Sequence, residues 1–488
     1  MLFLRKAIVP AALATVLYPL MATSPAEAAV VISSGATSNI TCSSGVCTPS
    51  ADASVLNVTQ LETMLASGNV TVNTRPKTAH DDINVHHAIT WASSSTLTLN
   101  AYENITVNDP ISVSGSGGLA IIDKTGPHGS VGVLSFGPQG YITFLNLASP
   151  LTINGNPCTL VGNISTLAAD VAANPTGDFA LAHSYNATPD GTYTSSPVPT
   201  TFSGYFNGLG NTISHLAARL TTPQTFGLFE NLEYPGIIQN INLDKETITG
   251  SGAGTNAGGL VGANSGQIVE VSANVNLINL AVAGGLVATN IGDMMYCYTS
   301  GKVDTGKTSA AQAGGLIGAN VVSGFSVGFM SLCYSTATVI VGKNSYGGGL
   351  VGYEQGFVGG TYATGAVTGG QGSYVGGLVG YAYLNTEDSQ VIESYSTGAV
   401  TATAGTAGGL IGDADGGITS TYWDTTTSGI GSLSQGAGTP SSESGITGLS
   451  TTQMQSGVPS GLSNEFWAES PSINGGLPYL VALPPNSL

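Results

Sequence analysis

Charge is scarce in this chain, and positive charge is the scarcest. Charged residues make up 8% of the 488 residues, with 10 Lys and Arg against 28 Asp and Glu, and no Lys or Arg follows Lys343. The formal net charge is −18. Nucleic acid and anionic lipid both require clustered cations, so neither is expected as a partner. An anionic polysaccharide is disfavoured for the same reason, unless calcium bridges the like charges.

Long apolar runs are absent except at the start. Arg5 and Lys6 precede an apolar stretch at 7–21, and Ala26-Glu27-Ala28 fits the small-x-small rule for signal cleavage. Residues 1–28 are therefore predicted to be a signal peptide, cleaved near Ala28. No other window reaches the length of a membrane-spanning helix. We expect a secreted or cell-surface protein of a bacterium, with no transmembrane segment in the mature chain.

Cysteine is also rare, with five in the whole chain. Cys42 and Cys47 flank a four-residue loop, which suits a local disulfide in an exported protein. Cys297 and Cys333 each precede a tyrosine of the repeat described below. They are expected to stack in neighbouring coils, either as a disulfide or as two buried thiols. Cys158 has no evident disulfide partner in the sequence.

Glycine is abundant, at 69 residues, and it recurs at fixed positions of a repeated sequence motif, called here the repeated phrase. Gly-Gly-Leu-Val-Gly occurs at 258–262, 348–352 and 376–380, with isoleucine forms at 314–318 and 408–412. Successive leucines are 26 to 34 residues apart. A repeat whose period drifts while its core phrase persists is typical of stacked coils with variable outer loops. The repeat leucines are Leu228, Leu260, Leu286, Leu316, Leu350, Leu378 and Leu410.

A second phrase, centred on a tyrosine, follows each leucine by 12 to 18 residues in most repeats. The segments between the turn residues are long enough for about three short strands per repeat and too short for an ordinary helix. The sequence thus predicts an all-β fold, a right-handed parallel β-helix with short capping helices. Whether these tyrosines face the core or the solvent stays open, as does the direction of Val261, which is adjacent to Leu260. The tyrosines are Tyr298, Tyr334, Tyr362, Tyr395 and Tyr422.

Two short helices are expected among the strands. Asn57 is a candidate N-cap for a helix that begins at Val58 and ends before Gly68, and this helix could plug the open end of the solenoid. Ser165 is a candidate N-cap for a helix at 166–173. The predicted division of the chain is a signal peptide at 1–28, a loose lead-in at 29–53, strand repeats at 54–160, a connecting segment at 161–200, leucine repeats at 201–425, and a Gly/Ser-rich spacer with a C-terminal cap at 426–488.

The repeats resemble those of a known group. The Gly-Leu-(Val/Ile)-Gly copies, Tyr-Ser-Thr-Gly-Ala-Val at 395–400 and Thr-Tyr-Trp-Asp-Thr at 421–425 are similar to proteins with GLUG-motif repeats. Residues 54–160 resemble the strand repeats of secreted exoproteins of the filamentous haemagglutinin type. The resemblance implies a right-handed β-helix on a bacterial surface, with adhesin-like or matrix roles, and a dedicated outer-membrane transporter as a possible partner.

Catalytic chemistry finds little support. Asp413 and Asp415 lie close in sequence, and Asp424 follows. A hydrolase needs two carboxylates at a defined separation. A role as turn carboxylates that cap backbone N–H groups explains these residues better. Asp413 and Asp415 are also the only weak candidates for calcium. The cluster of His80, Asp81, Asp82, His86 and His87 is a poor zinc site, since adjacent histidines on a strand face opposite ways.

The function expected is that of a non-enzymatic β-solenoid that presents an extended surface. It would adhere to host or matrix glycans or proteins, or to other copies of itself. Two alternatives remain: a carbohydrate-active β-helix enzyme of the hydrolase or lyase type, and a structural, self-assembling surface component. No catalytic residue and no cofactor is assigned.

Overall fold

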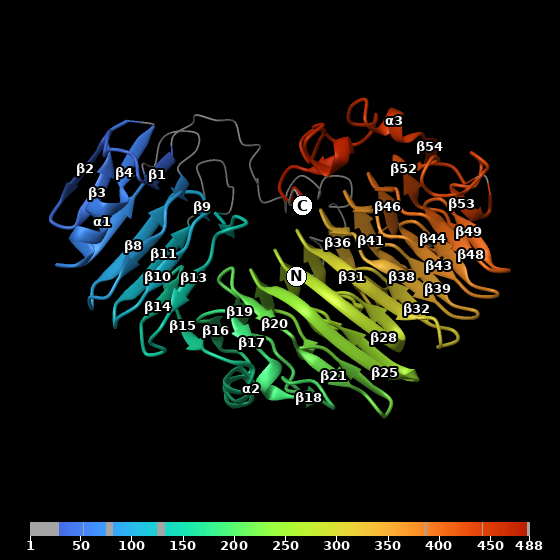
Figure 1. Ribbon diagram of the computed structural model, residues 1–488, viewed down its shortest axis with the longest axis horizontal. Helices are drawn as coiled ribbons and strands as arrows, with labels where there is room; N and C mark the ends of the chain where they lie inside the picture. Colours follow the sequence, from blue (N-terminus) through green and yellow to red (C-terminus); the bar gives the residue numbers. More distant parts are fainter. Residues whose placement is uncertain are drawn as a thin grey trace. The chain divides into compact units, whose positions relative to one another are not determined.

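The computed structural model describes residues 29–51, 53–74, 82–123, 132–384, 386, 388–441 and 443–485. The expected signal peptide, together with His80 and Asp81, lies outside these ranges. The fold is all-β, with 50% strand and 6% helix, and forms a β-solenoid of about 14 turns, which confirms the predicted fold class (Figure 1). The chain divides into two compact units. None of the described helices is long and apolar enough to cross a membrane.

The first unit reaches Gly162 and adds Asp178–Ser184 and Phe206–Thr212. Most of its strands pair in parallel, and Ile89, Ile111 and Ile142 lie in register and buried. A 5-stranded sheet has the order β12-β9-β6-β1-β4, and a 3-stranded sheet the order β13-β10-β7. A third row runs β2-β3-β5-β8-β11-β14-β15-β16. The bounds are β1 Ala29–Ser33, β2 Ile40–Ser43, β3 Val46–Pro49, β4 Ser54–Asn57, β5 Val70–Asn73, β6 Asp82–Val85, β7 Ile89–Trp91, β8 Thr96–Ala101, β9 Ile105–Val107, β10 Ile111–Val113, β11 Gly118–Asp123, β12 Leu134–Phe136, β13 Ile142–Phe144, β14 Leu151–Ile153, β15 Asn156–Val161 and β16 Asp178–Leu181.

Residues 29–53 are not the loose lead-in that their composition predicts. β1 lies between β4 and β6 in a parallel sheet, and β2 and β3 form an antiparallel hairpin whose second strand pairs with β5. The expectation failed because these pairings join segments that are distant in sequence, and a single short strand has no periodicity of its own. Cys42 and Cys47 form a disulfide across the hairpin, with an S–S distance of 2.00 Å.

Helix α1 (Val58–Leu65) closes the N-terminal end of this unit, as its sequence predicts. The Asn57 side chain accepts a hydrogen bond from the N–H of Gln60, and Val58, Leu61 and Leu65 are buried. The Glu62 carboxylate accepts the backbone N–H of Thr90 on β7 at 2.9 Å. That N–H would otherwise belong to an exposed strand edge, so the helix covers an edge that could pair with another chain.

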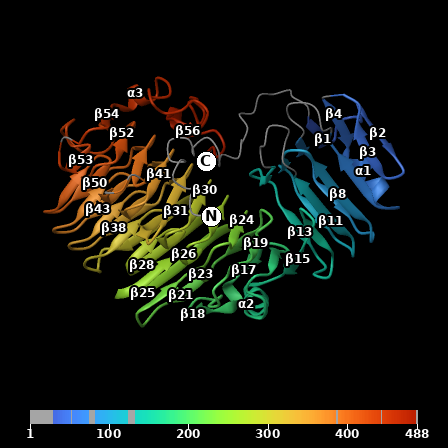
Figure 2. The same cartoon turned by 180° about the vertical axis from the view of Figure 1, so that it is seen from behind.

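The second unit comprises Asn163–Gly177, Tyr185–Tyr205 and the chain from Ile213 onward. Its rungs stack in three parallel rows (Figure 2). An 8-stranded sheet runs through β23 Phe229–Leu232, β26 Val261–Asn264, β29 Val287–Asn290, β33 Ile317–Asn320, β40 Val351–Glu354, β45 Val379–Tyr383, β50 Ile411–Asp415 and β53 Ala437–Thr439. A second row runs through β24 Ile237–Gln239, β27 Gln267–Val269, β30 Asp293–Met295, β36 Phe329–Ser331, β41 Phe357–Gly359, β46 Gln390–Ile392 and β51 Ile418–Thr419. β19 (Tyr205–Asn207) precedes β24.

The third row is a 20-stranded sheet, in which most rungs contribute several strands. Its members are β17 Tyr185–Asn186, β18 Thr192–Tyr193, β20 Thr212–Ser214, β21 Ala217–Arg219, β22 Gln224–Phe226, β25 Asn242–Gly258, β28 Ser272–Gly284, β31 Tyr298–Thr305, β32 Gln312–Gly314, β37 Tyr334–Ser335, β38 Thr338–Val341, β39 Tyr346–Gly348, β42 Tyr362–Ala363, β43 Val367–Gly369, β44 Tyr374–Gly376, β47 Tyr395–Ser396, β48 Val400–Ala402, β49 Thr406–Gly408, β52 Thr421–Asp424 and β54 Ile446–Leu449.

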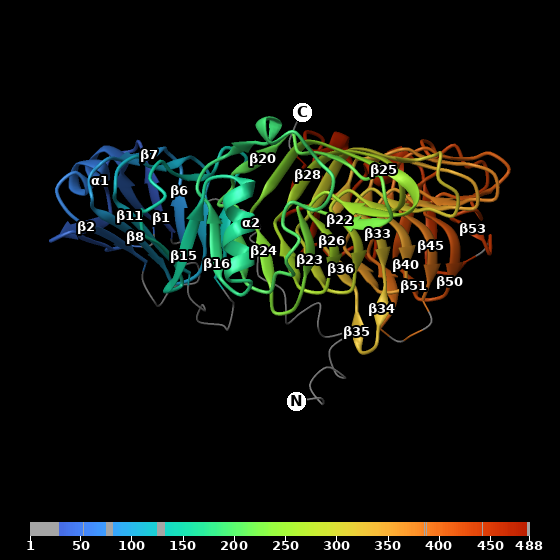
Figure 3. The same cartoon turned by 90° about the horizontal axis from the view of Figure 1, so that it is seen from below.

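A few elements lie outside these rows. Helix α2 (Ile164–Ala173) is capped by the Asn163 side chain, which accepts the N–H of Thr166 at 2.8 Å, so the N-cap expected at Ser165 is wrong by two residues. The hairpin of β34 (Val322–Ser323) and β35 (Ser326–Val327) projects from its rung (Figure 3). The remaining elements are η1 Thr188–Asp190, α3 Thr451–Met454, β55 Trp467–Ala468, η2 Asn474–Gly476 and β56 Tyr479–Leu480.

The repeated glycine phrase forms a sharp corner of the coil. At each copy the N–H groups of the leucine and of the next residue donate to one carbonyl of the following rung: Leu260 and Val261 both reach Leu286 O, at 3.0 and 3.1 Å. The chain therefore bends between them, and both side chains are fully buried, which answers the open question of the valine's direction. All seven repeat leucines are buried at 0% exposure.

The first glycine of each phrase has a steric reason. A Cβ at Gly376 would lie 2.1 Å from the carbonyl oxygen of Val379, and the corresponding distance at Gly348 to Val351 O is 1.9 Å. No side chain fits such a gap, since the corner folds the carbonyl back over the glycine. The spacing of this glycine from the leucine is thus a property of the bend itself.

A ladder of buried amides runs inside the 8-stranded sheet. The side-chain amide of Asn264 donates to Asn290 at 2.7 Å, that of Asn290 to Asn320 at 2.8 Å, and that of Asn320 to the Glu354 carboxyl at 2.8 Å. The next rung carries Ala382, so the ladder ends on Glu354. Each amide satisfies its neighbour, which is how polar groups are retained in a core.

Candidate binding surface

The tyrosine column predicted from the second repeat phrase exists, and its rings stack from rung to rung. Ring centroids are 5.0 Å apart for Tyr298 and Tyr334, 4.7 Å for Tyr334 and Tyr362, and 5.1 Å for Tyr362 and Tyr395. The next residue on each strand faces the glycine corner inside the coil: Ser396, for example, donates to Gly409 O at 2.8 Å. Because side chains alternate along a strand, the tyrosine rings point out of the coil.

Four of the five rings are nevertheless buried, and Tyr298 is half-buried. The C-terminal segment (Figure 1, red) packs on Tyr362, Tyr395 and Tyr422. Tyr395 donates its hydroxyl proton to Pro478 O at 2.5 Å and accepts from the Asn474 amide at 2.9 Å. The Trp467 ring packs 5.5 Å from that of Tyr395. Burial raises the pKa of the Tyr395 hydroxyl above its usual value. From Tyr362 to Tyr422 the column is therefore an internal seam between the solenoid and the C-terminal segment.

A second set of tyrosines, which the sequence reasoning missed, lies at the surface. We call Tyr346, Tyr353, Tyr374 and Tyr381 the tyrosine patch. All four are half-buried, and they come from β39, β40, β44 and β45. Tyr346 precedes Leu350 by four residues, and Tyr353 follows it by three. Tyr374 and Tyr381 have the same spacing around Leu378. The bend at each leucine brings the two tyrosines of a pair together.

The rings of the patch touch one another over two rungs. Tyr346 and Tyr381 have centroids 4.8 Å apart, Tyr353 and Tyr381 5.7 Å, and Tyr346 and Tyr374 6.0 Å. Tyr374 meets Tyr381 edge-on at 6.2 Å, with an interplanar angle of 80°. These offsets and tilts are favourable arrangements of aromatic pairs. The patch is thus a packed, partly exposed aromatic surface.

Two carboxylates continue this surface into the next rung. Asp413 on β50 lies beside Tyr381, and the exposed Asp415 beside Tyr383, which is itself 36% exposed. Partial burial raises the pKa of Asp413, and the charge of Asp415 raises it further. Burial and the Asp413 charge both raise the pKa of Tyr381. Hydroxyl and carboxylate groups therefore lie beside these half-buried rings.

The same two carboxylates were the candidates for calcium. Within the described ranges, no group of three or more His, Cys, Asp or Glu side chains gathers in a way that could hold a metal ion. Calcium takes six to eight oxygen ligands, of which this pair supplies a minority. The predicted calcium role for Asp413 and Asp415 gains no support.

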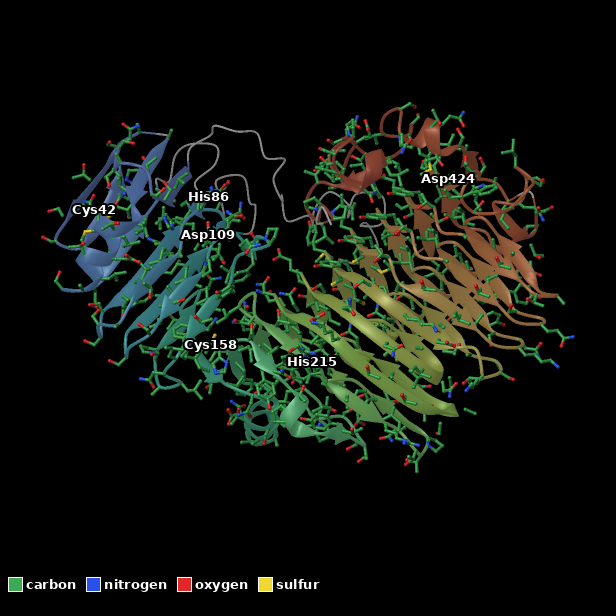
Figure 4. All side chains as sticks on the ribbon, viewed as in Figure 1. Cys42, His86, Asp109, Cys158, His215 and Asp424 are labelled. Atoms are coloured by element: carbon green, nitrogen blue, oxygen red, sulfur yellow. A yellow bond between two sulfur atoms is a disulfide. The ribbon has the colours of Figure 1, made fainter. Side chains whose placement is uncertain are left out.

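Asp424, the third carboxylate of the alternative enzyme hypothesis, has a structural environment (Figure 4). It is fully buried and accepts hydrogen bonds from the N–H of Thr426 at 2.8 Å and from the Thr451 hydroxyl at 2.6 Å. Asp413 lies on the outer face of a different sheet. The carboxylates of the hydrolase hypothesis are therefore used separately, one to hold a turn and the other at the surface.

The remaining candidates also have local roles. Asp82 is buried and accepts from both the backbone and the side chain of Asn104, at 2.9 and 3.1 Å, while His86 and His87 are exposed. Cys297 and Cys333 are free, buried thiols in register, as one of the two expectations has it, and the Cys297 N–H donates to the Cys333 sulfur at 3.2 Å.

Comparison with known proteins gives limited likenesses. No family model matches the chain. Over 104 residues, or 21% of its length, the chain is 29% identical to Halomucin of Haloquadratum walsbyi, and the match spans 1% of that protein. Among solved structures, it is similar to a Bacteroides ovatus protein described as a "putative immunoglobulin A1 protease", with 16% identity, a TM-score of 0.41, and coverage of 66% of this chain and 92% of the other.

Proposed function

We propose that this chain is a secreted or cell-surface protein of a bacterium that acts in adhesion to cells, to extracellular matrix or to other copies of itself. The observation that carries the proposal is the tyrosine patch with its neighbouring carboxylates, a surface aromatic cluster held on stacked coils. Tyrosine combines a large apolar face with a polar tip, which suits recognition surfaces. The similarity of the repeats to GLUG-motif proteins supports the same role, and we propose that relationship as well.

The architecture suits adhesion for a physical reason. Every rung of the second unit repeats the same outward positions, so side chains are displayed in rows at a spacing of about 4.8 Å on a backbone fixed by parallel hydrogen bonds. A rigid display loses little conformational entropy on binding. Many copies on one surface also raise the effective affinity of a weak contact.

The test is an attachment assay with the mature chain coupled to beads. Beads are offered cultured cells, extracellular matrix and surfaces coated with the same protein, and beads that carry the heat-unfolded chain serve as the control. We expect attachment to at least one of the three surfaces, and only by the folded chain. Equal retention of folded and unfolded beads on all three would refute the adhesive role.

A further inference from the structure

We propose that the tyrosine patch, with Asp413 and Asp415, is a binding site for an uncharged polysaccharide that lies along the stacked rungs. This inference rests on the proposed adhesive function and names its ligand class. The site consists of Tyr346, Tyr353, Tyr374, Tyr381, Asp413 and Asp415, from five strands of three successive rungs.

The aromatic part of the site fits the faces of sugar rings. A pyranose presents a face of C–H groups with slightly positive hydrogens, and the negative face of a tyrosine ring attracts them. The patch carries equivalent tyrosines in two neighbouring rungs, with centroids 6.0 Å apart in one row and 5.7 Å in the other. This step is close to the length of one sugar unit, so successive units of a chain could stack on successive rungs.

The polar part selects among polysaccharides. Tyrosine hydroxyls both donate and accept, and ionised carboxylates accept from sugar hydroxyls. The Asp413 carboxylate acts on both Tyr346 and Tyr381, and the Asp415 carboxylate acts on Tyr381. Uronic acids and sulfated glycans would meet these like charges, and no Lys or Arg follows Lys343. The balance of charge therefore favours an uncharged chain.

A cationic peptide is the competing ligand, since aromatic rings and carboxylates also attract ammonium and guanidinium groups. Enclosing a cation requires rings set apart around a space. Here the rings touch, with centroids between 4.8 and 6.2 Å. Such a surface suits the stacking of sugar rings better than the enclosure of a cation. We therefore favour the polysaccharide over the cationic peptide as the ligand.

The experiment is affinity electrophoresis and calorimetry on the mature chain. The probes are β-glucan, mannan and chitin oligosaccharides as neutral chains, polygalacturonate and alginate as anionic chains, and oligolysine as the cation. We expect binding to at least one neutral chain, little change between low and high salt, and no binding to the anionic chains. Tyr381→Ala should weaken binding about tenfold, which corresponds to about 1.4 kcal/mol.

The controls separate the binding contact from folding. Tyr381→Phe keeps the ring and should retain most of the affinity, whereas Asp413→Asn should weaken binding several-fold. Thr289→Ala changes the equivalent outward position two rungs earlier than Tyr353 and should leave affinity unchanged. Thermal melting of each variant verifies the fold.

Three results would overturn the proposal: no neutral chain bound, salt-sensitive binding to oligolysine alone, or unchanged neutral binding by a folded Tyr381→Ala protein. The bead assay keeps this outcome distinct from the wider hypothesis. Beads that attach while the protein binds no neutral glycan would leave adhesion standing and remove the polysaccharide. Wild-type beads that attach to nothing would remove adhesion itself.

Discussion

The end of the amide ladder makes stability depend on pH in a direction that can be measured. Glu354 is fully buried, and one of its carboxyl oxygens accepts from the Asn320 amide at 2.8 Å and from the Gly356 N–H at 2.6 Å. The other oxygen is buried and has no hydrogen-bond partner among the described residues. Burial raises the pKa of Glu354 well above its usual value, against the smaller lowering effect of the two hydrogen bonds.

The sign follows from proton linkage. The folded chain keeps the Glu354 proton, while the unfolded chain releases it above the ordinary value of 4.5. The contribution of Glu354 to the free energy of unfolding is therefore largest below pH 4.5 and falls as pH rises towards the folded pKa. One such carboxyl gives a slope of about 1.4 kcal/mol per pH unit. Glu246, which is also fully buried with a raised pKa, adds a slope of the same sign.

The perturbation is Glu354→Gln, which keeps the accepting oxygen and cannot ionise. As the pH rises above 4.5, the wild-type chain should lose unfolding free energy through Glu354, at a rate of up to about 1.4 kcal/mol per pH unit, and the variant should avoid this loss. The variant should thus equal the wild type near pH 4.5 and exceed it at pH 7. Denaturant unfolding at several pH values measures this, and Glu233→Gln, at an exposed position, is the matched control.

Parallel pH profiles for the wild type and Glu354→Gln would refute the reasoning. They would mean that the carboxyl is ionised in the folded chain, or that its environment opens to water before unfolding. A variant less stable than the wild type at pH 7 would likewise contradict it.

Three further substitutions test the architecture. Gly376→Ala forces a Cβ against a backbone carbonyl 2.1 Å away and should lower the free energy of unfolding by more than about 2 kcal/mol, whereas Gly68→Ala, with open space around it, should not. Asn290→Ala leaves two ladder neighbours without their amide and should lower it by about 1–3 kcal/mol in the same denaturation assay. Trp467→Ala should loosen the C-terminal segment, so that limited proteolysis removes it faster than from the wild-type chain while the coils remain protected.

The repeating core was predictable because its signals are local. A leucine that recurs between glycines indicates a buried position in each coil. Once the repeat is recognised, equivalent residues of successive coils are expected to stack. Helix α1 was predictable for a similar reason, since its cap at Asn57 and its apolar stripe lie within a dozen residues. The tyrosine patch carried a comparable signal, because Tyr346 and Tyr374 stand at one distance before a repeat leucine and Tyr353 and Tyr381 at one distance after it.

Other features depend on segments that meet only in the folded chain. One corner of the second unit holds Asn240, Glu270, Tyr296 and Leu332 at positive φ near +55°. Glu, Tyr and Leu rarely adopt this conformation, and the four positions share no residue type that would reveal it in the sequence. Stacking against neighbouring rungs imposes it, whatever the side chain.

The sequence by itself determined the coil, its apolar interior and its positions of sharp turning, because these arise from residues close together in the chain. Tertiary structure decided which tyrosines meet solvent. The later part of the predicted column, from Tyr362 to Tyr422, lies under the C-terminal segment, and Tyr395 donates a hydrogen bond to Pro478, some 80 residues further along the chain. The bend at the glycine motif places a different set of tyrosines at the surface. Alternation along a strand tells which way a side chain points, but only the remainder of the fold decides what covers it.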